Sequence, residues 1–347
     1  MRVRIYRKMK NVIRVASQLC PLFMCVILLA CGKKIVAEKE ECGEMTFSQS
    51  VVLQVDTLLY SQIADIVPIG SSSYVLTDGA SIYETDSTGT VIRKVSNQGH
   101  GNKEYIQIGK LYSDGQYIYA WCAMSLNLYK YDMDLNFIDK YQGPNCAVCR
   151  MAVLNGDTVY FQLTGGSDQA VCAAPLNHNG KMRREGCYTV EDKALLFNSI
   201  SGGLACFDGR TMYVRPSEMT VCTVGSGEAW TYEDKDFVVN PVTKSLDARP
   251  PKEALDYLLP NSTCSGLYAD GDFLWLITET GSFGMGQDGQ MSSDGRFLNL
   301  YKINKEGNLV SSYKYNYPKG IRYAISGGRL HVLVYDGSTY VVKQLEL

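Results

Sequence analysis

Short runs of aromatic and β-branched residues recur along the chain, and each run follows a turn pair that contains glycine. The six turn pairs, each with its run, are Ile69-Gly70 before 74–76, Asp114-Gly115 before 117–119, Asn155-Gly156 before 158–161, Asp208-Gly209 before 212–214, Asp270-Gly271 before 273–276 and Gly327-Gly328 before 330–333. Asp-Gly and Asn-Gly between extended runs indicate hairpins, because both central residues of a type I′ turn need positive φ. A hairpin repeated at roughly 40 to 60 residues is typical of a β-propeller with one blade per copy. We therefore predict an all-β fold, a six-bladed β-propeller.

A second pattern supplies the other strands of each blade. A tyrosine-rich or apolar run ends in Asp or Asn before a turn, and a further apolar run follows the turn. These pairs of runs are residues 82–86 with 91–95, 128–132 with 137–141, and 300–304 with 309–315. Four strands per unit, counted from the axis outward, form an antiparallel propeller blade.

The last unit ends after three strands, at residues 322–325, 329–334 and 340–345. Residues 50–56, from the other end of the chain, form an apolar run that can supply the missing outer strand. Such an N-terminal strand closes the ring and removes the unpaired strand edges that otherwise favour aggregation.

The first thirty residues resemble a secretion signal. They carry six Arg or Lys and no acid, followed by an apolar stretch over residues 19–30 that is too short for a stable membrane-spanning helix. The ending Leu28-Leu29-Ala30-Cys31 resembles the lipobox of bacterial lipoproteins, which implies cleavage before Cys31 and a lipid on that cysteine. We predict residues 1–30 as a lipoprotein signal peptide, 31–46 as a lipidated flexible tether and 47–347 as the propeller.

The formal net charge of the mature chain restricts the classes of partner that it can bind. Removal of residues 1–30 takes away six cations and no acid, which changes the formal net charge from −2 to −8. An acidic surface argues against nucleic acid as a partner and against electrostatic binding to anionic lipid. Attachment to a membrane must then come from the N-terminal lipid.

Nine cysteines remain after Cys31 and the two cysteines of the signal are set aside. An odd number leaves at least one free thiol. Cys122, Cys172, Cys206 and Cys222 lie in apolar strand-like runs, where a buried inert thiol is the ordinary state. The pair Cys146 and Cys149 has no second Cys or His pair at zinc-ligand spacing, and a disulfide that involves one of the two stays open.

Irregular segments gather on one predicted face. Because chain direction alternates within a blade, the loop from the second to the third strand and the connection to the next blade emerge on the same side, which we call the upper face. Its long segments are residues 98–105, 240–261 with a short helix expected at 252–259, and 278–296. Long loops on a rigid scaffold are where function concentrates.

Residues 99–105 read Gly-His-Gly-Asn-Lys-Glu-Tyr. This segment resembles the Gly-x-Gly-Pro-x-Glu-Tyr signature of the six-bladed β-propeller lipoproteins of bacterial cell envelopes, which have NHL- or TolB-like rings. Asn102 stands where that family usually has proline. The resemblance runs from about Cys31 to Leu347 and implies a lipid-anchored envelope propeller, most members of which have no assigned activity.

Several motifs of enzymes and metal sites fail on inspection. The segment 284–289 matches a dinucleotide-binding pattern, but no helix start follows it to bind a phosphate. The segment that begins at Asp132 resembles a calcium loop, yet Phe137 and Gly143 occupy the positions that require Gly and Glu. Three scattered histidines form no cluster for a transition metal, and no Gly-x-Ser-x-Gly elbow occurs.

The remaining candidates are acids and aromatics predicted on the upper face. They are His100, Glu104, Tyr105, Asp78, Asp168, Asp288, Asp294 and Asp336. Glu104 has a second interpretation, in which its carboxylate accepts backbone N–H groups and holds the loop. A calcium ion at the mouth of the central channel, as in lactonase-like propellers, would need such oxygen atoms to converge. We predict no cofactor, with calcium as the one alternative.

These observations lead to a first hypothesis of a binding or scaffold module, a monomeric ring held by its N-terminal lipid to a bacterial membrane, the outer membrane in the first instance. Its upper face would bind a carbohydrate, a peptide or an envelope protein. The alternative is a calcium-dependent hydrolase or lyase of the lactonase-like kind. A third possibility, a structural assembly subunit, would show an apolar patch on the side of the ring.

Overall fold

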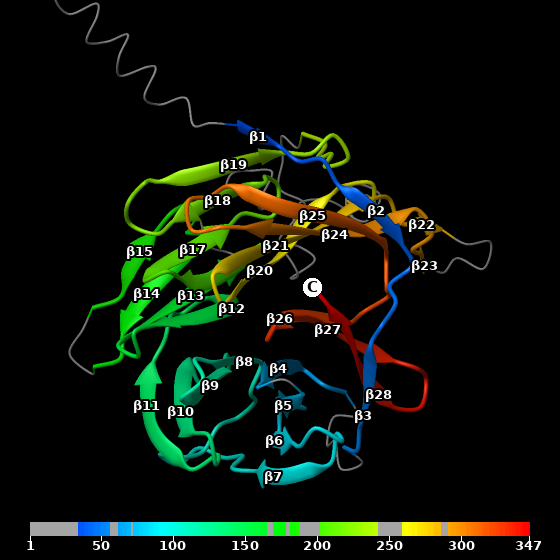
Figure 1. The fold of residues 1–347 in the computed structure, drawn as a ribbon. Coiled ribbons are helices and arrows are strands. Elements are labelled where there is room, and N and C mark those ends of the chain that lie inside the picture. Colours follow the sequence, from blue (N-terminus) through cyan, green and yellow to red (C-terminus); the bar gives the residue numbers. More distant parts are fainter. Residues whose placement is uncertain are drawn as a thin grey trace, which may run out of the picture.

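The computed structural model describes residues 34–55, 62–70, 72–164, 169–177, 181–187, 202–241, 259–285 and 291–347, and every regular element in these ranges is a β-strand. Figure 1 shows six sheets arranged around a central axis, with the first strand of each sheet innermost. The prediction of an all-β, six-bladed β-propeller is confirmed. Among the described residues, no helix has the length and apolar character needed to cross a membrane.

The blades consist of consecutive antiparallel strands. Blade 1 contains β4 (Asp65–Ile69), β5 (Ser73–Thr77), β6 (Ile82–Thr85) and β7 (Val91–Val95). Blade 2 contains β8 (Lys110–Ser113), β9 (Tyr117–Cys122), β10 (Asn127–Asp132) and β11 (Phe137–Gln142). Blade 3 contains β12 (Ala147–Leu154), β13 (Thr158–Thr164), β14 (Val171–Pro175) and β15 (Arg183–Glu185).

The second half of the ring follows the same plan, with a hairpin inserted in blade 5 and an outer strand in blade 6 that comes from the N-terminal part of the chain. Blade 4 contains β16 (Gly203–Phe207), β17 (Arg210–Val214), β18 (Thr220–Thr223) and β19 (Ala229–Glu233). Blade 5 contains β20 (Thr263–Asp270), β21 (Phe273–Gly281), β24 (Arg296–Ile303) and β25 (Leu309–Asn316), with a hairpin of β22 (Gly284–Met285) and β23 (Met291–Ser292) inserted between β21 and β24. Blade 6 contains β26 (Arg322–Ser326), β27 (Arg329–Tyr335), β28 (Tyr340–Glu346) and β3 (Gln49–Leu53).

The outer strand of blade 6 comes from the N-terminal part of the chain, as the sequence predicts. β3 pairs antiparallel with β28, from Leu53 opposite Tyr340 to Gln49 opposite Gln344. The strand then reaches blade 1, where the Gln54 N–H donates to the Gly89 carbonyl at 2.8 Å. β3 and the C-terminal strand β28 therefore lie in one sheet, beside the first blade.

The segment before β3 differs from the prediction. β1 (Lys34–Val36) pairs in parallel with β19, and β2 (Glu40–Gly43) pairs in parallel with β25. Figure 1 shows both strands along the outer edges of blades 4 and 5. The prediction of a flexible tether over residues 31–46 is wrong for residues 34–43, because exposed edge strands offer unpaired N–H and C=O groups that the charged segment satisfies. We call residues 34–43 the strap.

Apolar side chains fill the space between neighbouring blades. One cluster joins blades 4 and 5 through Met212, Val221, Leu276 and Tyr301, and Ile35 and Ala37 of the strap pack against it. Other clusters join the remaining blades in the same way. Because each blade shares its apolar face with two neighbours, the closed ring is one packing unit.

Two further predictions have a structural outcome. The nine cysteines in the described ranges, Cys42, Cys122, Cys146, Cys149, Cys172, Cys187, Cys206, Cys222 and Cys264, are all free thiols, so neither Cys146 nor Cys149 forms a disulfide there. Cys122 and Cys172 are buried as expected, whereas Cys206 and Cys222 are half-buried. The helix expected at residues 252–259 lies almost wholly outside the described residues.

Candidate functional site

The signature segment after blade 1 is held together by its own residues. The carboxylate of Glu104 accepts the Gly101 N–H at 2.8 Å, and a Cβ at Gly99 would lie 2.0 Å from that carboxylate. Tyr105 is fully buried, and its hydroxyl lies 3.1 Å from the carbonyl oxygens of Ala80 and Val95. Tyr105 is therefore a core residue, and its prediction as a binding residue is wrong. Glu104 is exposed but holds the loop, which matches its structural interpretation.

Two of the predicted acids hold turns of their own chain segments. Asp78 is buried, and its carboxylate accepts the N–H groups of Ala80 and Ser81 and the Tyr83 hydroxyl. The exposed Asp336 accepts the N–H groups of Ser338 and Thr339. Such carboxylates stabilise turns.

The rest of the predicted set adds no cluster. His100 and Asp294 are exposed in the structure. Asp168, Asp288 and Cys31 lie outside the described residues. Within the ranges that the structure describes, no three His, Cys, Asp or Glu side chains lie close enough together to hold a metal ion.

The feature that does resemble a binding site is the central channel. A cavity of about 440 Å³ runs along the axis and is lined by the innermost strands of all six blades, β4, β8, β12, β16, β20 and β26. This volume lies within the range of small-molecule sites. The channel also reaches the upper face, because Tyr317 and Gly320 of the connection from blade 5 to blade 6 belong to its lining.

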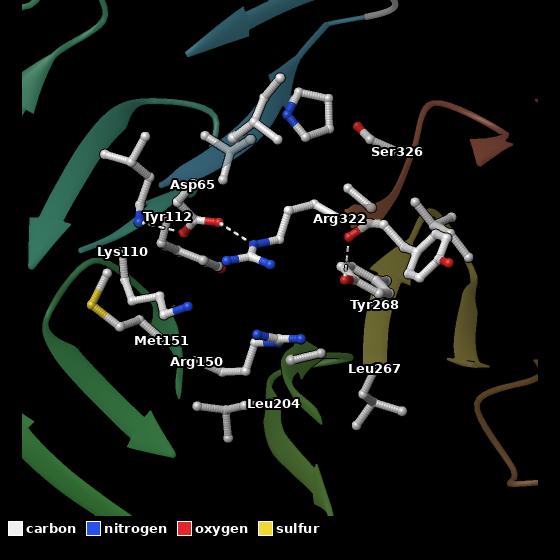
Figure 2. Close-up of a pocket in the computed structure, with 18 of the residues that line it drawn as sticks. Asp65, Lys110, Tyr112, Arg150, Met151, Leu204, Leu267, Tyr268, Arg322 and Ser326 are labelled. Atoms are coloured by element: carbon white, nitrogen blue, oxygen red, sulfur yellow. Dashed lines mark hydrogen bonds and ion pairs between the residues drawn. The ribbon is translucent and has the colours of Figure 1, made fainter. Parts of the chain in front are cut away.

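Three cations project into the upper part of this channel. Lys110 is the first residue of β8, Arg150 lies in β12, and Arg322 is the first residue of β26. Figure 2 shows their charged groups pointing toward the middle of the channel from three directions. Burial lowers the pKa of the Lys110 ammonium group, the charge of Asp65 raises it, and the charges of Arg150 and Arg322 lower it further.

Two β-bulges position Arg150. The register of β12 against β13 shifts at Cys149, and the register of β20 against β21 shifts at Ser265. The Arg150 guanidinium donates to the Cys149 carbonyl at 2.9 Å and, across the channel, to the Ser265 carbonyl at 3.1 Å. A bulge redirects backbone groups and side chains in a strand. Here the carbonyl groups of both bulged residues accept hydrogen bonds from the same guanidinium.

Arg322 is fixed at the junction of blades 6 and 1. Its guanidinium donates to the Ile321 carbonyl at 2.9 Å and to the Ala64 carbonyl at 3.3 Å. Its Nε lies 4.0 Å from Oδ1 of Asp65, while Oδ2 of Asp65 accepts the Leu111 N–H at 2.8 Å. Asp65 thus offsets part of the positive charge and joins the inner strands of blades 1 and 2.

The other acids of the lining have partners of their own. Glu279 pairs with Arg296 at 3.3 Å, and both side chains are buried. Asp114 lies at the lower turn of blade 2, where its carboxylate accepts the N–H groups of Gln116 and Tyr117 and the Tyr119 hydroxyl. The upper part of the channel therefore keeps a net positive charge in a chain whose overall charge is negative.

Aromatic side chains form much of the remaining wall. Tyr112, Tyr268, Tyr317 and Tyr323 line the cavity. The Tyr268 hydroxyl donates to the Tyr323 carbonyl at 2.5 Å (Figure 2), and the rings of Tyr317 and Tyr323 meet edge to face at 6.5 Å. Such walls offer flat apolar surfaces and hydroxyl groups to a ligand.

The sequence pattern did not point to Lys110, Arg150 and Arg322, because the candidate residues were sought among the acids and aromatics of the loops. Each cation lies in the innermost strand of its blade, and Lys110 and Arg322 begin their strands, as the oppositely charged Asp65 begins β4. A charged residue at this position in three blades was the available signal. The convergence of the three side chains depends on ring closure and on two bulges that the pattern does not reveal.

A family model described as a 6-bladed beta-propeller (DUF5128) matches residues 56–259. No curated protein matches the chain. A member of the DUF4221 family from Bacteroides vulgatus has a similar structure, with a TM-score of 0.65, 8% identity, and coverage of 88% of this chain and 99% of that one. A Bacteroides fragilis protein that is named as an exported protein is similar with a TM-score of 0.59 and 12% identity, over 91% of this chain and 100% of that one.

Proposed function

The chain belongs to this family of 6-bladed β-propellers, and from that premise we propose that it is a lipid-anchored binding module of a bacterial cell envelope that receives its ligand at the upper mouth of the central channel. The observation that carries the proposal is the cationic channel itself. A roomy cavity with few converging polar groups on rigid strands is the usual form of a ligand site. Lys110, Arg150 and Arg322 provide those groups.

The N-terminal sequence supports the anchor and the export. Residues 28–31 have the lipobox pattern, and the name of the similar Bacteroides fragilis protein agrees with export. Cys31 precedes Lys34 by three residues, which span at most about 10 Å in an extended chain. A lipid on Cys31 would therefore hold the side of blade 4 close to the membrane.

The direction of the strap supports an outward-facing channel mouth. β1 runs parallel to β19, and β19 leads from the lower face toward the upper-face connection to blade 5. The chain therefore enters the strap from the side of the lower face. In this arrangement the upper mouth of the channel points away from the attachment point.

The alternative hypotheses have less support. A calcium-dependent hydrolase needs converging oxygen ligands, whereas the upper channel presents three cations, and the carboxylates of Asp78 and Asp336 hold turns. An assembly subunit needs an apolar patch on the side of the ring. Of the ten exposed large apolar residues in the described ranges, five lie in outer strands of five different blades, namely Val36, Val52, Ile92, Ile138 and Val310.

In-cell photo-cross-linking tests the proposal. A photoreactive amino acid replaces Tyr317 at the channel mouth in the full-length chain, and the control carries the same group at the exposed Ile138 on blade 2. We expect a specific adduct with a glycan, peptide or protein at position 317 and none at 138, as analysed by mass spectrometry. No adduct at position 317, or identical adducts at both positions, would contradict the channel as the binding site.

The anchor has a separate test. In a Cys31→Ser variant we expect loss of metabolic labelling with a palmitate analogue and release from the membrane fraction. Labelling of the variant at wild-type level would contradict lipid attachment at Cys31.

A further inference from the structure

Lys110 is a half-buried cation that forms no ion pair with any described residue, and Asp65, whose charge acts on it, lies beside Arg322. Among the described residues, no side chain or carbonyl group accepts a hydrogen bond from its ammonium group, although the lining of the channel encloses it. A charged group that is removed from water on folding and gains no partner in the protein destabilises the folded state. Such a cost is tolerated at sites where a ligand supplies the missing partner.

The two arginines next to Lys110 also keep donors for a ligand. A guanidinium has five N–H donors. In Arg150 and in Arg322, the carbonyl groups named above hold the two Nη atoms with one hydrogen bond each. Each Nη carries a second N–H, so both side chains are fixed in position and can still donate. Prearranged donors of this kind are the usual means of binding a carboxylate.

The charge count indicates how many anionic groups the channel can accept. Lys110, Arg150 and Arg322 carry three positive charges, and Asp65 beside Arg322 offsets one of them. The Glu279–Arg296 pair is neutral by itself. Two negative charges would therefore balance the upper channel.

We infer that the channel binds an acidic saccharide, with sugar carboxylates at Lys110, Arg150 and Arg322 and a sugar ring against the tyrosine walls. This inference rests on the proposed function of the channel as a ligand site. The four tyrosines favour a sugar, because ring faces and hydroxyl groups together match its alternating apolar and hydroxyl surfaces. A cavity of about 440 Å³ has room for a short oligosaccharide rather than for a folded partner.

Titration calorimetry with a matched pair of sugars tests the inference. Digalacturonate carries two carboxylates, and its dimethyl ester has almost the same shape without the charge. We expect the acid to bind at least about tenfold more tightly than the ester, with an affinity that falls as salt increases. Equal binding of acid and ester, or binding of neither, would overturn the inference.

Variants locate the effect in the channel. We expect Lys110→Met to weaken digalacturonate binding about tenfold and to leave binding of the ester unchanged, and we expect Lys110→Arg to restore most of the affinity. Lys305→Met removes a cation from the outside of blade 5 and should bind digalacturonate as the wild type does. Because Lys110→Met removes an unpaired charge, its melting temperature should equal or exceed that of the wild type, which separates lost binding from lost folding.

Three further outcomes are decisive. Full digalacturonate affinity in Lys110→Met would overturn the assignment of the carboxylate to these cations. Tighter binding of a triglutamate peptide than of digalacturonate would overturn the saccharide class in favour of an acidic peptide. An adduct at position 317 together with no binding of digalacturonate would leave the proposed function standing while the present inference falls.

Discussion

Gly203 shows how closely the inner strands of neighbouring blades approach at single residues. A Cβ at this position would lie 2.3 Å from the backbone nitrogen of Leu267 and 2.4 Å from its Cβ. Because backbone cannot move aside cheaply, we expect Gly203→Ala to lower the free energy of unfolding by about 1–3 kcal/mol. The control is Gly109→Ala, where no atom lies within 4 Å of the added Cβ. Equal midpoints of the two variants in urea would contradict this account.

Burial of His331 makes the free energy of unfolding of the ring depend on pH. The side chain is buried in β27, with Nδ1 at 3.1 Å from the Tyr74 hydroxyl and Nε2 at 3.2 Å from the Ser326 carbonyl. Burial lowers the pKa of His331 below its ordinary value of 6.5; the Ser326 carbonyl raises it, the Arg329 charge lowers it and the Asp270 charge raises it. The unfolded chain therefore binds the proton more readily than the folded chain.

The sign of the effect follows from that difference. Stability that His331 supplies above pH 6.5 is lost as the pH falls through 6.5 toward the lower folded pKa. We expect the free energy of unfolding of the wild type to decrease more steeply between pH 6.5 and 5 than that of His331→Gln. Guanidinium unfolding at several pH values measures both curves, and parallel curves would show that His331 does not titrate differently on unfolding.

The turn residues show what the sequence predicts at this scale and what it does not. At Asn155-Gly156 and Asp208-Gly209, both residues have positive φ, as a type I′ turn requires. At Asp114-Gly115, only the glycine does, with a φ of 87°. Asp114 instead accepts backbone N–H groups with its carboxylate. The dipeptide therefore predicts that the chain turns, while the turn type depends on the side-chain hydrogen bonds available nearby.

The strap is the element whose stability can be tested most directly. Lys39 is almost fully buried and pairs with Asp234 at 2.7 Å and with Asp236 at 2.9 Å. Removal of one partner from a buried ion pair leaves an uncompensated charge, here that of Asp234, which is 1% exposed. We expect Lys39→Ala to destabilise the protein by about 3 kcal/mol and to speed amide hydrogen exchange in residues 34–43.

A second lysine of the strap provides the matched control. Lys34 pairs with Glu233 at 2.7 Å, but both side chains are exposed. Exposed pairs contribute little because water and salt screen them, so Lys34→Ala should leave the unfolding midpoint unchanged. A similar loss in both variants would mean that the strap depends on its charge in general and not on the buried contact.

The pattern of apolar residues predicts the strands within each blade well. It does not predict which segments pair along the outer edges of the blades or where bulges occur. The predicted outer strand at residues 91–95 has the same bounds as β7, and the predicted strand 309–315 is one residue shorter than β25. The strap was missed because half of its ten residues are charged, so that the few apolar residues that pack inward, such as Ile35 and Ala37, form no alternating pattern. Bulges such as those at Cys149 and Ser265 are equally hidden, since they arise from pairing between strands.

At the scale of the whole molecule, ring closure depends on the pairing of the C-terminal strand β28 with β3, which comes from the N-terminal part of the chain. β28 lies between β27 and β3, so it holds the N-terminal strand in blade 6. Deletion of residues 338–347 would remove this strand and leave β3 without its partner. Because each blade packs on two neighbours, we expect the deletion to abolish cooperative unfolding and to expose apolar surface to a hydrophobic dye.

Deletion of the strap provides the control that shows whether cooperativity is lost because the ring is no longer closed. A variant that lacks residues 34–43 loses β1 and β2 but keeps β3 and its pairing with β28. Its ring remains closed, so we expect a lower melting temperature and one cooperative transition by calorimetry. The number of deleted residues is the same in the two variants, ten in each, and hence a difference in cooperativity reports the position of the lost strands. A cooperative transition after loss of residues 338–347 would show that five blades suffice to hold the fold, and that the sixth is an accessory to the channel that it helps to line.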